Sequence, residues 1–135
     1  EAPSAVNWQP YRFVLVDDAD KRKEVAKAAS QRFLSKAPLL IVGVADPKKS
    51  PQWHLVDTVI ALTQMMLAAY ERGLAGVWIG AFDEIEVKKV LDVPEDLVVA
   101  GILALGVPNQ KPHPITRKTI EELFAGNSYS QSVKP

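Results

Sequence analysis

Residues 54–80 read HLVDTVIALTQMMLAAYERGLAGVWIG, and the rest of the chain is organised around this stretch. Its first part, Leu55 to Tyr70, leaves no broad polar face, which predicts a long buried helix rather than one lying on a surface. Its last part, Gly76 to Gly80, places an aromatic residue between two glycines. This part is predicted to form a buried turn or a short strand.

One edge of the predicted helix carries small or polar side chains at spacings of three and four residues. These residues are Asp57, Ala61, Gln64, Ala68 and Glu71. Such an edge allows a second helix to approach closely. Because a chain of 135 residues has little material with which to cover a helix on all sides, we expect part of the cover to come from a second subunit. The sequence therefore predicts a homodimer, with an interface above roughly 2,000 Å².

The composition fits one compact domain, with 47% hydrophobic residues, 24% charged residues and a formal net charge of zero. The charge balance predicts no nucleic-acid partner and no anionic membrane partner, and no run is a confident membrane span. The chain has no cysteine, which excludes disulfides, thiolate metal ligands and cysteine nucleophiles and is compatible with the cytoplasm, the compartment we expect. The two histidines, His54 and His113, lie in no ligand-like cluster, so no metal site is predicted.

Outward from the central stretch, apolar runs bounded by turn residues predict three strands. They are a mostly buried strand over 11–16, a central strand over 39–45 and a third strand over 97–106. Helices are predicted at about 19–34, 84–91 and 115–124, the first capped by Asp18 and the second by Asp83. Because the helices are unequal, an α+β sandwich competes with a doubly wound sheet. One domain is expected over 1–125, followed by a polar C-terminal tail over 126–135.

No catalytic constellation is visible in the sequence. There is no nucleophile elbow, phosphate loop, dinucleotide fingerprint or supported carboxylate pair, and no residue is predicted to be catalytic. An enzyme without an evident acid, base or nucleophile commonly relies on a bound cofactor for its chemistry, while the protein supplies binding, orientation and electrostatics.

Three pieces of the chain carry motifs of a known family. Residues 2–13, APSAVNWQPYRF, resemble an APS-x-x-N-x-QPW-x-F loop and the strand after it, with Tyr11 in the usual tryptophan place. Residues 73–82, GLAGVWIGAF, are similar to a GLG-x-x-WIG-x-F turn, and residues 114–118, PITRK, resemble a basic motif near the C-terminus. These are motifs of the nitroreductase-like family of FMN-dependent oxidoreductases.

The resemblance implies an α+β fold, with a mixed β-sheet sandwiched by helices and the long helix at a dimer interface. It also implies that a homodimer holds FMN between its subunits. Hydride would pass from NADH or NADPH through the flavin to a small oxidised acceptor such as a nitroaromatic or a quinone. The loop of one subunit and the turn of the other would bracket the same flavin.

The motif match also supplies the expected cofactor-binding residues. They are Pro3, Ser4, Ala5 and Asn7 in the loop, the backbone of Trp78, Ile79 and Gly80 against the isoalloxazine, and Arg117 and Lys118 at the phosphate. Glycine permits close approach to the ring, and the planar fork of arginine can bind two phosphate oxygens. The family's usual N-terminal helix, with its Arg-Ser-x-Arg segment, is not in this sequence, so the phosphate is expected to rest on Arg117 and Lys118. Gln31 could reach a flavin edge, but a solvent position is favoured for it.

Two other functions remain open from the sequence. One is a dimeric module that binds flavin for storage, sensing or delivery without turnover. The other is a structural α+β dimer with no ligand.

Overall fold

We describe the fold from a computed structural model, which covers residues 1–110 and 112–132. The elements are, in chain order, η1 Ala5–Asn7, β1 Tyr11–Val16, α1 Ala19–Ala28, η2 Arg32–Lys36, β2 Leu39–Ala45, α2 His54–Glu71, β3 Ala75–Ile79, α3 Glu84–Val90, β4 Val98–Gly106 and α4 Ile120–Leu123. The strands form one sheet in the order β1-β2-β4-β3. All three pairings between these strands are antiparallel, so strand direction is not mixed within the described sheet. The fold is α+β, as predicted, and the doubly wound alternative is excluded.

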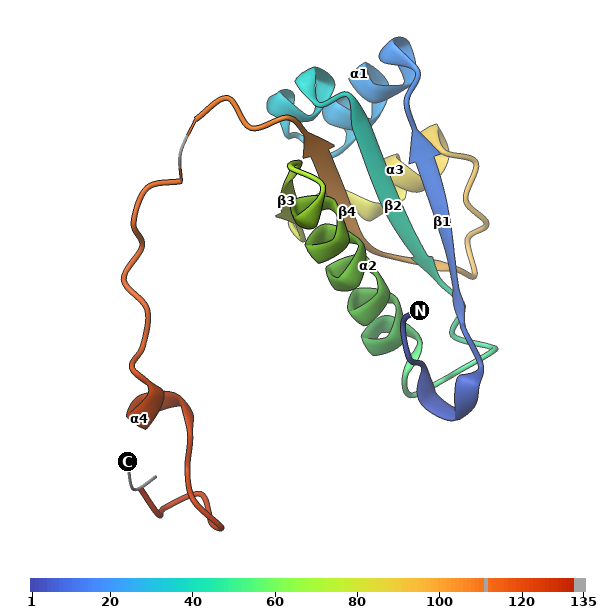
Figure 1. The fold of residues 1–135 in the computed structure, drawn as a ribbon. Helices are drawn as coiled ribbons and strands as arrows, with labels where there is room; N and C mark the ends of the chain where they lie inside the picture. Colours follow the sequence, from blue (N-terminus) through green and yellow to red (C-terminus); the bar gives the residue numbers. More distant parts are fainter. Residues whose placement is uncertain (111, 133–135) are drawn as a thin grey trace.

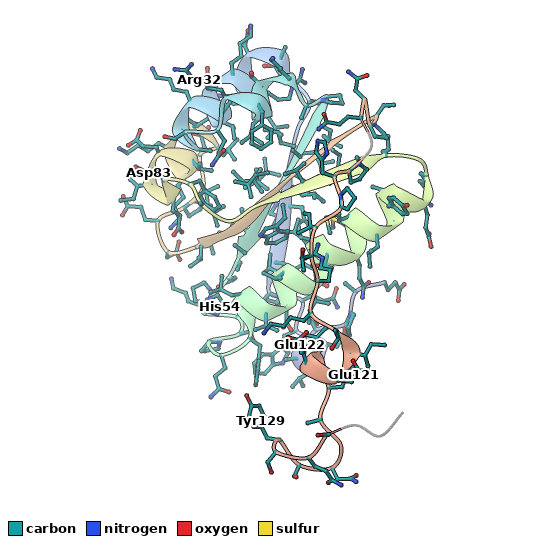
Figure 2. The ribbon with its side chains drawn as sticks, turned by 90° about the vertical axis from the view of Figure 1, so that its left-hand side faces the viewer. Arg32, His54, Asp83, Glu121, Glu122 and Tyr129 are labelled. Atoms are coloured by element: carbon teal, nitrogen blue, oxygen red, sulfur yellow. The ribbon has the colours of Figure 1, made fainter. Side chains whose placement is uncertain are left out.

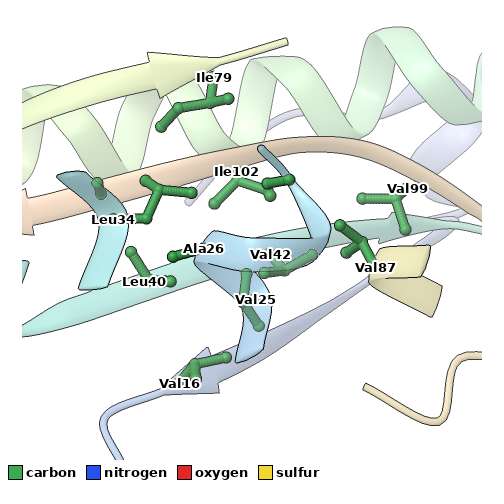
Figure 3. Packing of buried hydrophobic residues seen from close by; sticks show 12 residues of the cluster. Val16, Val25, Ala26, Leu34, Leu40, Val42, Ile79, Val87, Val99 and Ile102 are labelled. Atoms are coloured by element: carbon green, nitrogen blue, oxygen red, sulfur yellow. The ribbon is translucent and has the colours of Figure 1, made fainter. Parts of the chain in front are cut away.

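Helices cover both faces of the sheet (Figure 1). On one face, α1, η2 and α3 enclose an apolar cluster that includes Val25, Leu34, Leu40, Val42 and Ile102 (Figure 3). On the other face, α2 packs on a smaller cluster of Ile41, Leu62, Ala69, Leu103 and Leu105. The side chains of β2 alternate between the two clusters because successive residues of a strand point to opposite faces. The predicted sandwich is therefore present.

The central helix α2 agrees with its prediction to within a residue at each end. It stops because Gly73 takes a left-handed backbone with φ of 77°, and the Gly73 N–H donates to the Tyr70 carbonyl at 2.9 Å. Within one chain only one side of α2 is covered. The covered side comprises Asp57, Thr58, Ala61, Leu62 and Ala69.

The opposite side of α2 exposes large apolar side chains, and we name it the outer face of α2. It consists of Leu55, Val56, Val59, Leu67 and Tyr70, and Tyr70 is 76% exposed. The predicted contact edge is divided along its length: Asp57 and Ala61 are buried within the chain, whereas Gln64, Ala68 and Glu71 are exposed. The N-terminal loop covers Asp57, so that edge as a whole cannot be where a second helix docks.

The first helix is shorter than predicted. α1 ends at Ala28 rather than near Leu34, because Ser30 takes a left-handed backbone with φ of 54°. The chain then forms the separate short helix η2. The predicted caps are confirmed: Asp18 accepts from the Lys21 N–H at 2.7 Å, and Asp83 accepts from the Glu86 N–H at 3.1 Å.

The first strand is less buried than predicted because it lies at an edge of the sheet. β1 pairs only with β2 in the described residues, and Leu15 is 63% exposed. An edge strand has one side and part of one face open to solvent.

After Gly106 the described residues 107–110 and 112–132 leave the body as an extended arm (Figure 1). Within these described residues the arm has one helix, the four-residue α4, which begins with a capping box of Thr119 and Glu122. The predicted helix over 115–124 is therefore wrong for residues 115–119. Residues 133–135 of the predicted C-terminal tail lie outside the described part of the chain.

None of the helices in residues 1–110 and 112–132 has the length and hydropathy needed to cross a membrane.

Candidate functional site

The N-terminal loop is tightly folded on itself. Val6, Asn7 and Gln9 all have left-handed backbones, with φ of 51°, 57° and 48°. Such conformations cost of order 1–3 kcal/mol each in residues other than glycine, so surrounding contacts must hold them. Within the loop, Ser4 Oγ accepts from the Gln9 N–H at 3.0 Å, and the Ser4 carbonyl accepts from the Asn7 N–H at 3.0 Å. Ser4 therefore already has a structural role.

Asp57 attaches this loop to the start of α2. Its carboxylate oxygens lie 3.1 and 3.2 Å from the Ala5 backbone nitrogen, which donates to them, and the residue is only 3% exposed. A carboxylate in the first turn of an 18-residue helix is also favoured by the helix dipole. Sequence reasoning assigned Asp57 to a dimer contact. The available signal was an isolated carboxylate on an otherwise apolar helix, which calls for a nearby donor.

The turn after β3 uses its side chains for packing. A Cβ atom built on Gly101 would lie 2.6 Å from the Trp78 ring atom Cζ2, so the indole lies directly against the β4 backbone where no side chain stands. Ile79 is 5% exposed and belongs to the cluster on the other face of the sheet. Gly80 is exposed. What this turn offers to a ligand is therefore mainly its backbone.

β3 is the other edge of the described sheet and pairs there only with β4. An edge strand presents unpaired N–H and C=O groups along its open side. A flat ring that forms hydrogen bonds at its rim matches such an edge, and glycine at position 80 leaves room for it.

Gln31, the residue before η2, contacts the same turn. Its side-chain Nε2 donates to the Ala81 carbonyl at 3.4 Å, and the residue is half-buried. Gln31 is therefore partly open to solvent, as favoured, and it also contacts the turn. The contact was not visible in the sequence because 50 residues separate the two partners.

Arg117 and Lys118 lie on the arm, exposed and just before α4. They do not open a helix, as the pattern had indicated, since Thr119 is the residue that caps α4. Among the hydrogen bonds and ion pairs of the described residues, none joins these cations to the loop or to the turn.

The three predicted parts of the site are thus separate within one chain. The loop leads into β1 and the turn ends β3, and these are opposite edges of the four-stranded sheet. With strands about 4.8 Å apart, the two edges are roughly 14 Å from each other. Within one chain, the loop and the turn therefore lie at opposite sides of the sheet. The described residues also contain no group of three or more histidine, aspartate or glutamate side chains suited to a metal ion.

Comparisons with known proteins place this geometry in a family. The sequence profile of the nitroreductase family matches residues 26–107, a range that contains the turn but neither the loop nor the arm cations. A relative in Archaeoglobus fulgidus, named as an NADH dehydrogenase/NAD(P)H nitroreductase, is 34% identical over 119 residues. That match covers 82% of this chain and 68% of the relative.

Two solved structures share the fold. One, from Parabacteroides distasonis and also named as an NADH dehydrogenase/NAD(P)H nitroreductase, has a TM-score of 0.85 and 26% identity over 95% of this chain and 79% of that one. The other is the NADPH:FMN oxidoreductase of Vibrio harveyi in complex with NAD+. It has a TM-score of 0.84 and 28% identity over 96% of this chain and 64% of that one.

Proposed function

The chain belongs to the nitroreductase family of flavin-dependent oxidoreductases, and we propose that it works as a homodimer with FMN held between the subunits. In this proposal it oxidises NADH or NADPH and reduces a small oxidised acceptor, such as a nitroaromatic or a quinone. A cytoplasmic location stays a prediction.

The observation that supports the proposal best is the separation of the loop and the turn on opposite edges of one sheet. A single chain offers only half of a site at each edge. A two-fold axis would pair the loop of one subunit with the turn of the other and so complete two equal sites. The outer face of α2, which is apolar and exposed, is a suitable surface for that contact.

The chemical groups at the loop, the turn and the arm match the parts of FMN. The open backbone of β3 and Gly80 would receive the rim of the isoalloxazine, and the Asn7 side chain could add a hydrogen bond from the partner loop. Arg117 and Lys118 would neutralise the phosphate. When bound, FMN supplies the capacity to accept and release reducing equivalents. The chain's own contribution is to bind it, to orient it and to exclude water.

Absorption spectroscopy tests the proposal directly. Purified protein mixed with FMN and then freed of excess cofactor should retain a flavin spectrum, and NADH or NADPH added without oxygen should bleach it. A nitroaromatic or a quinone should then restore the colour with turnover. Absence of bound flavin at high FMN concentration would refute the proposal. Bound flavin that stays yellow with both nucleotides would identify a flavin-holding module instead of an enzyme.

A further inference from the structure

A cleft of about 780 Å³ opens between α1 and η2. These two helices lie on the side of the sheet opposite α2 (Figure 1). We name this cleft the basic cleft. Its polar lining consists of Lys23, Lys27, Ser30, Arg32, Ser35 and Lys36, and no acidic side chain lines it. The whole chain has 16 cationic and 16 acidic residues, so four cations around one cleft are a local excess of positive charge.

The charge of the basic cleft is largely uncompensated in the described residues. Lys23 forms an exposed ion pair with Asp20 at 2.8 Å, which contributes little energy. Lys27, Arg32 and Lys36 form no ion pair with any residue in 1–110 or 112–132. Like charges held around one hollow repel each other, and a bound anion would relieve that repulsion.

The segment that joins α1 to η2, which supplies part of the lining of the basic cleft, also contacts the turn of the proposed flavin site. Gln31 stands between two of the lining residues, Ser30 and Arg32, and its side chain binds the carbonyl of Ala81, the residue after Gly80. Figure 2 places Arg32 on the same helical layer as Asp83, which follows the turn. A neighbouring hollow shares Lys27 and Ser30 with the basic cleft and reaches Asp83, and Glu24 and Glu86 also line it. A molecule that extends from the turn into the basic cleft would pass these carboxylates.

We propose that the basic cleft holds the phosphate groups of the dinucleotide electron donor, an inference that rests on the proposed function. A nicotinamide nucleotide combines a ring that must reach the flavin with a pyrophosphate that trails away from it. Arginine and lysine are the side chains that bind phosphate oxygens best. Because NADPH carries a further phosphate on its ribose, the cleft favours NADPH over NADH.

The test uses two variants with the same loss of charge. In the first, Arg32→Ala and Lys36→Ala remove two cations of the cleft. In the control, Lys48→Ala and Lys89→Ala remove two lysines that lie outside it, in exposed pairs with Asp96 and Glu86. All four side chains are exposed, so both proteins should fold, which circular dichroism and the melting temperature would verify.

Binding is measured first on protein without flavin, by calorimetry with adenosine 2′,5′-bisphosphate, a probe that has no nicotinamide. The cleft variant should bind it at least tenfold more weakly than the wild type, and the control should bind it as the wild type does. In protein loaded with FMN, the cleft variant should raise KM for NADPH by a similar factor, raise KM for NADH less, and leave bleaching by dithionite unchanged.

Three results would overturn the inference. They are failure of the wild type to bind the bisphosphate, equal binding by wild type and cleft variant, and unchanged NADPH kinetics in the cleft variant. In the last case, inorganic pyrophosphate that binds the wild type as tightly as the bisphosphate does would identify the cleft as a general anion site. Failure of the proposed function would look different: FMN would not bind, while the bisphosphate result would still stand.

Discussion

At the scale of single residues, Arg117 is the predicted main anchor of the FMN phosphate. It lies exposed on the arm and forms no ion pair with any residue in 1–110 or 112–132. Losing one charge-assisted hydrogen bond costs on the order of 1.5–3 kcal/mol, so Arg117→Ala should weaken FMN binding by roughly ten- to a hundredfold. Riboflavin, which has no phosphate, should bind the variant and the wild type equally. Equal weakening of both ligands would show that Arg117 supports the fold instead.

Asp57 is predicted to hold the loop in the shape that binds the cofactor. Asp57→Ala leaves the Ala5 N–H without its acceptor, which should lower the free energy of unfolding by about 1–3 kcal/mol and weaken FMN binding. Asp57→Asn keeps one acceptor oxygen and should recover part of the affinity. Asp18→Ala is the matched control, because it also removes a carboxylate that binds a backbone N–H near the start of a helix. If both alanine variants bind FMN equally well, Asp57 has no specific role in the loop.

At the scale of secondary-structure elements, substitutions at Gly101 and Gly80 should have different effects. The first should disturb the packing of the turn, and the second should disturb its contact with the flavin. A Cβ on Gly101 would lie 2.6 Å from the Trp78 ring, so Gly101→Ala should displace the indole and destabilise the fold by about 1–3 kcal/mol. A Cβ on Gly80 would meet only Trp78 Nε1 at 3.4 Å, an ordinary contact. Gly80→Ala should therefore keep its melting temperature and yet bind FMN more weakly. If its FMN affinity equals that of the wild type, the backbone at Gly80 does not lie against the flavin.

The sequence was sufficient for elements whose pattern is strong and local. β2 and α2 are long apolar runs with clear ends, and Asp18 and Asp83 are caps whose partners lie three residues away. It was insufficient where distant contacts decide. The left-handed backbone of Ser30 shortens α1, and the contact from Gln31 to Ala81 spans 50 residues. For the site, the motifs identified the loop and the turn, but only the strand order shows that they lie at opposite edges of the sheet.

At the scale of the whole molecule, the outer face of α2 predicts the homodimer. Sedimentation at micromolar concentration should show a dimer, and Leu67→Asp should convert it to a monomer that no longer retains FMN. Leu15→Asp is the control, because Leu15 is 63% exposed and Leu67 is 58% exposed, yet Leu15 lies on β1. A monomeric wild type would contradict the prediction, as would dissociation of both variants.

The exposed apolar side chains of the arm also predict a homodimer. Ile115, Ile120, Leu123, Phe124 and Tyr129 are all exposed along it, and Figure 2 shows Tyr129 at its far end. Large apolar side chains on a segment that lies away from its own body are suited to cover a partner. We therefore expect the arm to lie on the second subunit in the dimer.

The placement of the loop and the turn on opposite sheet edges has a consequence for mixtures of two defective chains. A subunit with Asp57→Ala has a damaged loop and a sound turn, and a subunit with Gly80→Ala has the reverse. If each site draws one part from each subunit, a hybrid of the two contains one site with both defects and one with none. Refolding the two weakly binding variants together in equal amounts should thus restore wild-type FMN affinity in roughly a quarter of the sites, by complementation between subunits. A site built within a single chain could not recover in this way.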